Sequence, residues 1–322
     1  MSHYRNRRAL VIGGFGFIGR HVTDRLRALG ADVTIVTRSL AAHREAIPVV
    51  SAGGASVVEG DLRDVPAMAA AVSGQDVIFN LAGQSGAARS MEDPYTDLDV
   101  NVRGNLVLLD AIRAENPGAK LVFVSSRLAY GSGGSGPIDE ARPPDPLCVH
   151  AIHKLAVEQY LRVYRSVYGV RSTVARLTNP YGPGQPAART TYGVVNRLIH
   201  LALTDQALPI YGDGHQRRDY IFIDDAVDAL LVLGRSAPGD AETYNVGSGV
   251  GTPLVDMARA IVAMAGGGRL VFTEWPRIAE QIETGDFVAD VARIEREIGW
   301  RPRVALADGL QRTVAHYRAQ VS

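Results

Sequence analysis

The sequence predicts an α/β protein, built on a doubly wound parallel sheet with a smaller mixed α/β lobe on its C-terminal side. Two observations lead to this fold class. Short apolar runs alternate with helical patterns through the first half of the 322-residue chain. Those runs are continuously apolar rather than alternating, which is typical of strands buried on both faces of a parallel sheet.

The first part of the chain carries six of these units. The predicted strands cover residues 8–12, 32–37, 56–59, 76–80, 120–125 and 172–176. Apolar residues at helical spacing predict helices at residues 18–29, 65–72, 96–115 and 150–168. We therefore expect residues 1–177 to form the domain that carries the doubly wound sheet.

The pattern changes after residue 177. Residues 179–186 are rich in glycine and proline, which predicts a loop. Beyond it the sequence predicts helices at 193–204, 224–234 and 253–265 and a strand at 218–223. Such a mixed region suits a substrate-binding lobe over residues 178–322, and we expect some of its segments to return to the first domain.

Composition excludes several classes of function. The 34 basic and 34 acidic side chains balance, so no positive excess favours nucleic-acid binding. A single cysteine, Cys148, allows no intrachain disulfide, and we find neither a signal-peptide core nor an 18-residue apolar stretch. The eight histidines are scattered, which argues against a metal site. We expect a cytoplasmic protein without a membrane or nucleic-acid partner.

A glycine-rich motif follows the first predicted strand. It reads Gly13-Gly-Phe-Gly-Phe-Ile-Gly19 and runs directly into a predicted helix. Glycines there allow a tight turn and close approach of a pyrophosphate, while the start of the helix offers unpaired N–H groups. The motif predicts a dinucleotide site of the Rossmann type, in which Gly13, Gly16, Phe17, Ile18 and Gly19 contact the cofactor.

The residues after the second and third strands bear on which dinucleotide binds. An acid near the end of the second strand would hold the ribose 2′-hydroxyl of NAD, but Thr37 stands there and Arg38 follows. An arginine suits the 2′-phosphate of NADP, or it stacks on adenine or is solvated, so both NAD and NADP stay open. Asp61 is either a partner for the adenine amino group or a solvated loop acid. Leu62 and Ala82 are further candidates for the same site.

A second group of residues lies after the fifth strand. That strand ends in Ser125-Ser-Arg-Leu-Ala-Tyr-Gly131, and a helix opens some 20 residues later with His150-Ala-Ile-His-Lys154. Together with the glycine motif, these segments resemble the extended short-chain dehydrogenase/reductase family of nucleotide-sugar epimerases and dehydratases. Further matches in chain order lie at residues 101–104, 176–183, 211–214, 218–220, 245–248, 285–287 and 298–300. The resemblance thus covers nearly the whole chain.

The resemblance implies a catalytic serine, tyrosine and lysine. In that family a tyrosinate takes a proton from a sugar hydroxyl while the nicotinamide takes a hydride, and the lysine lowers the tyrosine pKa and binds the cofactor ribose. Ser126 matches the serine and Lys154 the lysine. The position of the tyrosine is occupied by His150, which is the main departure from the family pattern.

A histidine at this position could still transfer a proton. Residues 150 and 154 are one helical turn apart, so the Lys154 ammonium would lie near the imidazole and keep it neutral near pH 7. A neutral imidazole is a competent general base. The alternatives are that Tyr130, His153 or Ser126 supplies the proton, or that redox chemistry is lost. We interpret His153 as an ordinary helix residue.

The residues after the serine favour one reaction over others. Ser126 is followed by Arg127 and Leu128, where the family's 4,6-dehydratases carry Asp-Glu for water elimination and the decarboxylases a glutamate. The resemblance therefore implies an epimerase, most commonly at C4, serving glycan or secondary-metabolite biosynthesis. The alternatives are an NADPH-dependent keto-sugar reductase and, from another class, a redox-inactive dinucleotide-binding regulator.

The resemblance also implies how the nucleotide-diphosphate sugar is held. Asn179 and Arg218 match the family's diphosphate-binding positions, although Arg218 could instead pair with Asp219 or Asp224. Residues 281–284 lack the arginine that usually precedes the Gly-Asp there, so the nucleotide is held differently. Ser85 and Arg89 are candidates for sugar contacts, with a helix cap and a solvated arginine as alternatives.

Two structural expectations complete the resemblance. Asn101 is expected to support the backbone of the active site. The family usually dimerises through the long helices after strands four and five, here residues 96–115 and 150–168, so we expect a homodimer.

Overall fold

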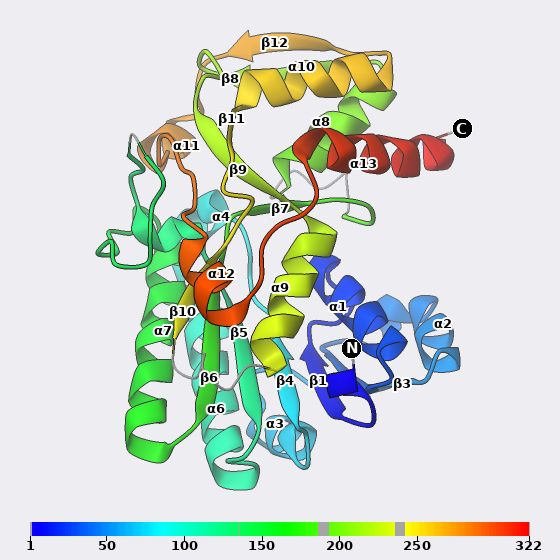
Figure 1. Cartoon of the computed structure of the whole chain (residues 1–322), viewed down its shortest axis with the longest axis vertical. Coiled ribbons are helices and arrows are strands. Elements are labelled where there is room, and N and C mark those ends of the chain that lie inside the picture. The colour runs from blue at the N-terminus through cyan, green and yellow to red at the C-terminus, as the bar shows by residue number, and fades with distance from the viewer. Residues whose placement is uncertain (1, 135, 186–192, 236–241, 322) are drawn as a thin grey trace.

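Figure 1 shows the computed structural model of the chain, which describes residues 2–134, 136–185, 193–235 and 242–321. Its centre is a seven-stranded parallel sheet in the order β10-β6-β5-β4-β1-β2-β3. The strands are β1 (Arg8–Ile12), β2 (Asp32–Thr37), β3 (Ala55–Glu59), β4 (Val77–Asn80), β5 (Lys120–Ser126), β6 (Arg171–Leu177) and β10 (Thr243–Val246). The predicted doubly wound sheet of the Rossmann type is confirmed.

Helices cover both faces of this sheet. One face packs against α1 (Phe17–Ala28) and α9 (Ile223–Arg235), and the other against α3 (Val65–Val72), α6 (Gly104–Glu115) and α7 (Val149–Tyr168). Side chains alternate along β1, with Ala9 and Val11 in the first core and Leu10 and Ile12 in the second. Both faces of each central strand are therefore buried, which explains their continuous apolar sequences.

A smaller lobe occupies the upper part of Figure 1. It holds a three-stranded sheet of β7 (Asn179–Tyr181), β9 (Arg217–Phe222) and β11 (Gly251–Pro253), and a parallel pair of β8 (Ala207–Tyr211) with β12 (Arg269–Thr273). The helices α8 (Val194–Leu203), α10 (Leu254–Ala265) and α13 (Leu306–Val321) pack on one another. After building part of this lobe, the chain returns to the large sheet through α9 and β10.

Shorter helices complete the described chain. They are α2 (Ala46–Ala52), α4 (Ala87–Glu92), α5 (Pro94–Leu98), α11 (Arg277–Gln281) and α12 (Ala292–Ile298), with one-turn 3₁₀ helices at Ser2–Tyr4, Ala41–His43 and Arg127–Tyr130. In the part of the chain that the structure describes, no helix is long and apolar enough to cross a membrane.

Two sequence predictions differ from the structure. The loop predicted over residues 179–186 begins as strand β7, since β7 is an edge of its sheet and Pro180 removes no essential ladder hydrogen bond there. The single helix predicted over residues 96–115 is divided into α5, a π-helical turn over Asp99–Arg103 and α6. The extra residue in the π turn redirects Asn101, whose side-chain amide hydrogen-bonds the backbone of Gln84.

Candidate active site

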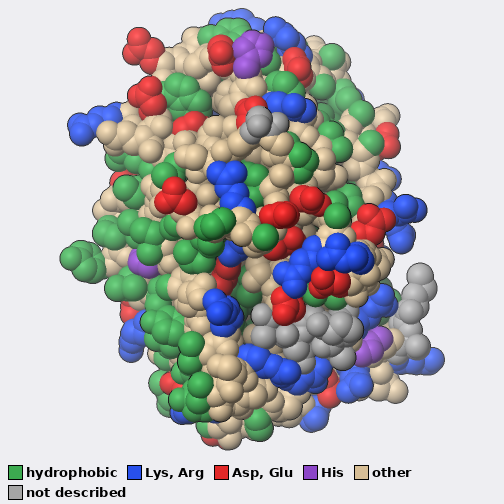
Figure 2. Space-filling model, turned by 60° about the vertical axis from the view of Figure 1, so that its left-hand side comes forward, with side chains coloured by type: hydrophobic (Ala, Val, Ile, Leu, Met, Phe, Trp, Pro, Cys, Tyr) green, Lys and Arg blue, Asp and Glu red, His purple; other side chains and the backbone are tan. Residues whose placement is uncertain are grey.

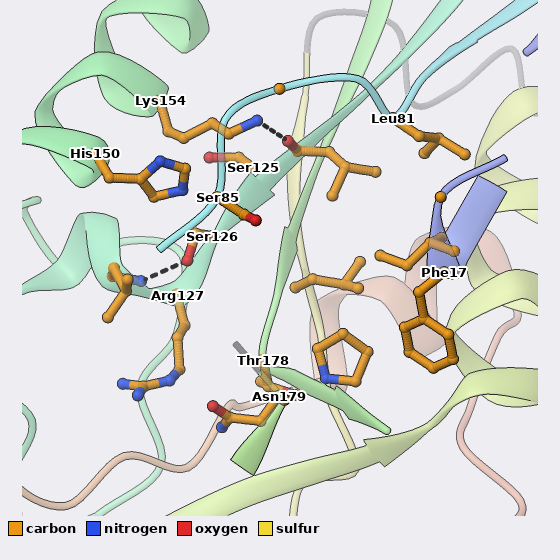
Figure 3. A pocket seen from close by; sticks show the side chains of 18 of the residues that line it. Phe17, Leu81, Ser85, Ser125, Ser126, Arg127, His150, Lys154, Thr178 and Asn179 are labelled. Atoms are coloured by element: carbon orange, nitrogen blue, oxygen red, sulfur yellow. Dashed lines mark hydrogen bonds between the residues drawn. The ribbon is translucent and has the colours of Figure 1, made fainter. Parts of the chain in front are cut away.

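A cavity of about 410 Å³ opens at the carboxyl edge of the large sheet, where strand order reverses between β1 and β4. This is where open α/β sheets bind their ligands. Its walls are the glycine motif, residues 81–85 after β4, residues 124–128 at the end of β5, and His150 and Lys154 on α7. Residues 177–180 close it from the lobe (Figure 3).

The glycine motif forms a cradle that other residues could not make. Gly13 has a φ of +84°, and a Cβ there would lie 2.9 Å from the backbone nitrogen of Ala82. A Cβ on Gly19 would lie 2.1 Å from the carbonyl oxygen of Gly13. Gly16 is the N-cap of α1, and Gly16, Phe17, Ile18 and Gly19 line the cavity. This close approach of backbone at a helix N-terminus fits a dinucleotide pyrophosphate.

An adjoining cavity of about 700 Å³ extends from the glycine motif towards β2 and β3. The candidate residues that line it are Gly13, Thr37, Arg38, Asp61, Leu62 and Ala82. Asp61 is not simply solvated, because Arg63 donates to both of its carboxylate oxygens, at 2.9 and 2.7 Å. That hydrogen bonding lowers the pKa of Asp61 to about 2. Arg38 makes no ion pair with any described residue, so its guanidinium is available to a ligand of this cavity.

Lys154 and Ser126 face the first cavity. The Lys154 ammonium donates to the Val124 carbonyl oxygen at 3.0 Å and lies over the Phe123 ring, 4.8 Å from its centroid. Burial lowers the pKa of Lys154 to about 8. The hydroxyl oxygen of Ser126 accepts from the Leu128 amide at 3.2 Å, which leaves the serine proton for a ligand. Figure 3 shows Ser126, His150 and Lys154 on one side of the cavity.

His150 is held by a carboxylate that the sequence analysis did not single out. Asp97 on α5 is fully buried; its Oδ2 lies 3.4 Å from Nδ1 of His150, and its Oδ1 lies 2.7 Å from Nδ1 of His153. Burial alone would raise the pKa of Asp97, but hydrogen bonds from His150, Asn101 and His153 outweigh it and lower the pKa to about 2. The sequence signal was the pair of histidines three residues apart, since one acceptor can serve both on the same helix face.

The ring of His150 is neutral at pH 7. Burial lowers its pKa, and the Lys154 charge lowers it further, while Asp97 acts in the opposite direction. The predicted effect of Lys154 is present, although burial is the larger cause. Nδ1 of His150 lies 3.4 Å from Oδ2 of Asp97 and also 3.4 Å from Nδ2 of Asn101. Oδ2 is buried and makes no hydrogen bond to a described residue, so the tautomer with the proton on Nδ1 offers it a donor and leaves Nε2 as an acceptor.

Two of the alternative proton donors are placed away from the cavity walls. The Tyr130 hydroxyl is buried and donates to Oδ1 of Asn245 at 2.7 Å, and burial raises its pKa to about 12. His153 points to Asp97. Neither residue lines the cavity, whereas His150 and Ser126 do.

Of the residues predicted to bind substrate, three line at least one of the two cavities and Arg218 lines neither. Asn179 and Ser85 line the first cavity, and Arg89 lines the adjoining one. Ser85 does not cap α4, whose N-cap is Gly86 with no side-chain hydrogen bond. Arg218 lines neither cavity: it pairs with Glu283 rather than with Asp219 or Asp224, and it donates to the Gly285 carbonyl at 2.5 Å.

Comparisons with known proteins agree with this geometry. Residues 9–247 match the model of the NAD-dependent epimerase/dehydratase family. The chain is 33% identical over 318 residues to a UDP-glucose 4-epimerase of Mycolicibacterium smegmatis, covering 97% of this chain and 98% of that protein.

Solved structures give the same result. The UDP-glucose 4-epimerase of Thermotoga maritima, solved with UDP-glucose, superposes with a TM-score of 0.89 at 30% identity, over 98% of this chain and 100% of that one. The dTDP-glucose 4,6-dehydratase of Streptomyces venezuelae, solved with NAD bound, superposes with a TM-score of 0.86 at 30% identity, over 97% of each chain. The fold is therefore shared with enzymes that differ in the reaction they catalyse, one of which was solved with NAD bound.

Proposed function

The chain belongs to the NAD-dependent epimerase/dehydratase family, an enzyme family acting on nucleotide sugars, and we propose that it is a nucleotide-diphosphate-sugar epimerase that inverts C4 with His150 in place of the usual tyrosine. The observation that carries this proposal is the position of His150, held by Asp97 and facing the same cavity as Ser126 and Lys154. His153 contacts the same carboxylate but does not line the cavity, whereas the His150 ring does.

The residues present fit each proton step. A nicotinamide dinucleotide held by the glycine motif and Lys154 would supply the hydride acceptor for C4 of the sugar and the donor that returns the hydride to the opposite face of the ring. Nε2 of His150 accepts the proton of the C4 hydroxyl, and Asp97 stabilises the imidazolium that forms. Ser126 donates its hydroxyl proton in a hydrogen bond to the forming carbonyl oxygen. After the keto sugar has turned over, His150 returns the proton, so neither cofactor nor base is consumed.

The end of β5 argues against dehydration. Water elimination needs a second acid and base beside the reacting carbon, but Arg127 and Leu128 stand at those positions and both line the cavity. The similarity to dehydratases therefore supports the fold and the cofactor, and it does not extend to the elimination chemistry.

The test is to incubate the NAD-loaded protein with pairs of C4 epimers and follow the sugar by NMR. Under the proposal, either epimer gives the same equilibrium mixture with no net change in nicotinamide absorbance at 340 nm. Stoichiometric consumption of NADPH with a keto sugar would instead support the reductase. Arg38 in the adjoining cavity favours that second candidate, because it suits the NADP 2′-phosphate.

We also propose that the enzyme acts as a homodimer. Tyr95 on α5 is 82% exposed and Val167 on α7 is 63% exposed, and α7 adds Ile152 and Val163. Figure 2 shows hydrophobic side chains gathered over the lower left of the molecule. A second copy would cover this apolar surface. The cytoplasmic location expected from the sequence stays a prediction.

A further inference from the structure

Two aromatic rings are stacked in the wall of the adjoining cavity. Phe15 stands in the middle of the glycine motif and His43 ends the 3₁₀ helix Ala41–His43, and both line this cavity. Their ring centroids are 4.4 Å apart and their planes differ by 14°. Each side chain is half-buried, so both rings are partly open to the cavity and to solvent. Neither residue is among those predicted from the sequence to contact the cofactor.

The stack joins two loops that follow neighbouring strands. Phe15 follows β1 and His43 follows β2, and these two strands pair in parallel in the large sheet. The loop after β2 is also attached to β3, because the Leu40 amide donates to Oε1 of Glu59 at 3.1 Å. The rings therefore connect the glycine motif to the residues after β2, so that both loops contribute to one wall of the cavity.

The division between the two cavities indicates which half of a dinucleotide meets this wall. His150 and Lys154 line the first cavity, which is where a nicotinamide has to lie for hydride transfer to a sugar. Gly16 lines both cavities, so the pyrophosphate cradle lies between them. The adjoining cavity, of about 700 Å³, is left for the adenosine half, and it is the one that Phe15 and His43 line.

The rings are suited to a nucleoside. Burial lowers the pKa of His43 and the charge of Arg20 lowers it further, so the imidazole is neutral at pH 7. Neutral aromatic rings offer an apolar surface against which a purine can pack. Polar groups for the remainder of the adenosine half are supplied by Arg38 and Asp61, which line the same cavity.

We propose that Phe15 and His43 form an aromatic clamp that packs against the adenosine half of the cofactor and slows its release. This inference goes beyond the proposed function, because it concerns retention of the dinucleotide and not the reaction. Slow release suits a reaction in which the hydride is returned to the same sugar before the cofactor can exchange.

The test measures how fast the full chain, loaded with NADH, releases it during a chase with excess ADP-ribose, followed by nicotinamide fluorescence. Phe15→Ser and His43→Ala should each release NADH about 3- to 10-fold faster than the wild type, the effect expected for loss of one aromatic contact. The double variant should be little faster than the faster single variant, because the two rings act as one pair.

Two further variants separate the clamp from other effects. His43→Phe keeps a ring in the stack and should release NADH as slowly as the wild type. His316→Ala is the matched control, because it removes a ring contact with Tyr317 and neither of these residues lines either cavity. His43→Ala decides the test even if Phe15→Ser fails to fold, since Phe15 packs against the core and His43 does not.

Two results would overturn the inference. One is release from His43→Ala at the wild-type rate. The other is release from His43→Phe as fast as from His43→Ala, which would assign the effect to the ring nitrogens of His43 and not to the stacked ring. Because release is measured without any sugar, a clamp would stand even if no epimer formed. Epimerisation with wild-type release from His43→Ala would leave the proposed function intact and remove only this inference.

Discussion

The buried carboxylate of Asp97 lies behind the imidazole of His150, with Oδ2 3.4 Å from Nδ1. The two residues come from α5 and α7, 53 positions apart in the chain. Asp97 is in turn fixed by His153, at 2.7 Å, so its position does not depend on His150 alone. A carboxylate fixed in this way orients the ring and stabilises the imidazolium formed when the base accepts a proton.

Asp97→Asn should lower kcat by about 10²-fold or more, with a smaller effect on KM, because the ring loses the anion that orients it and stabilises its charged form. Asp97 raises the pKa of His150, and His150 must be neutral to accept a proton. Removing the charge therefore lowers this pKa, so the acid limb of the pH profile of kcat should move to lower pH. A loss of kcat without movement of that limb would indicate a merely structural role.

His150→Phe should lower turnover by roughly 10²–10⁴-fold, the range for loss of a general base, while the dinucleotide stays bound. Retained NAD can be measured by absorbance after denaturing the purified protein. His150→Tyr, which restores the family residue, should keep much more activity than the phenylalanine variant. His215→Phe is the matched control at an exposed position. Wild-type turnover in His150→Phe would refute the assignment of the base.

Lys154 should set an alkaline limit to activity. Its pKa is about 8, because burial disfavours the ammonium form. As pH rises through that value the charge is lost, and with it the cation that we propose holds the cofactor ribose. We expect kcat/KM to fall above about pH 8 and the fall to move to higher pH in Lys154→Arg, since arginine keeps its charge. An alkaline limb that does not move would assign the limit to another group.

Glu158 and Arg176 form a buried ion pair behind the site. Arg176 donates from Nη2 to Glu158 at 2.6 Å, and Ser125 donates to the same carboxylate at 2.5 Å. Glu158→Gln should lower the free energy of unfolding by about 3–5 kcal/mol, because it leaves a buried guanidinium without its anion. Chemical denaturation measures this change. Asp256→Asn, in an exposed pair with Arg259, should change it by less than about 1 kcal/mol.

The local sequence was sufficient for six of the seven strands of the large sheet and for the dinucleotide cradle, but not for β10, which joins the sheet from the second half of the chain. The strands of the first domain, the glycine motif and the His150–Lys154 spacing are short-range patterns. In the structure the predicted strands form, and the glycine motif, His150 and Lys154 line the same cavity. Continuous apolar strands have few alternatives to a buried parallel sheet. The fold class therefore followed from the pattern of apolar residues alone.

The partners of the site residues depended on long-range contacts instead. Asp97 reaches His150 through packing of α5 on α7, and Glu283 reaches Arg218 across 65 positions. No local pattern distinguishes these acids from solvated ones. The π turn that positions the Asn101 side chain could not be predicted either, because the apolar spacing of residues 96–115 is that of one continuous helix. Only the tertiary structure shows which polar side chains meet.

Arg38 provides the last prediction, on the choice between NAD and NADP. It lines the adjoining cavity together with Thr37, and no acid stands at the end of β2 to hold a ribose 2′-hydroxyl. If a 2′-phosphate binds there, Arg38→Ala should weaken NADP by about 10-fold or more and NAD much less, because a charge-assisted contact is lost only with the phosphate. Dissociation constants for both dinucleotides, measured on protein stripped of cofactor, give the comparison. Equal losses would assign Arg38 to the adenine or the shared ribose, and the enzyme would then follow its family in using NAD.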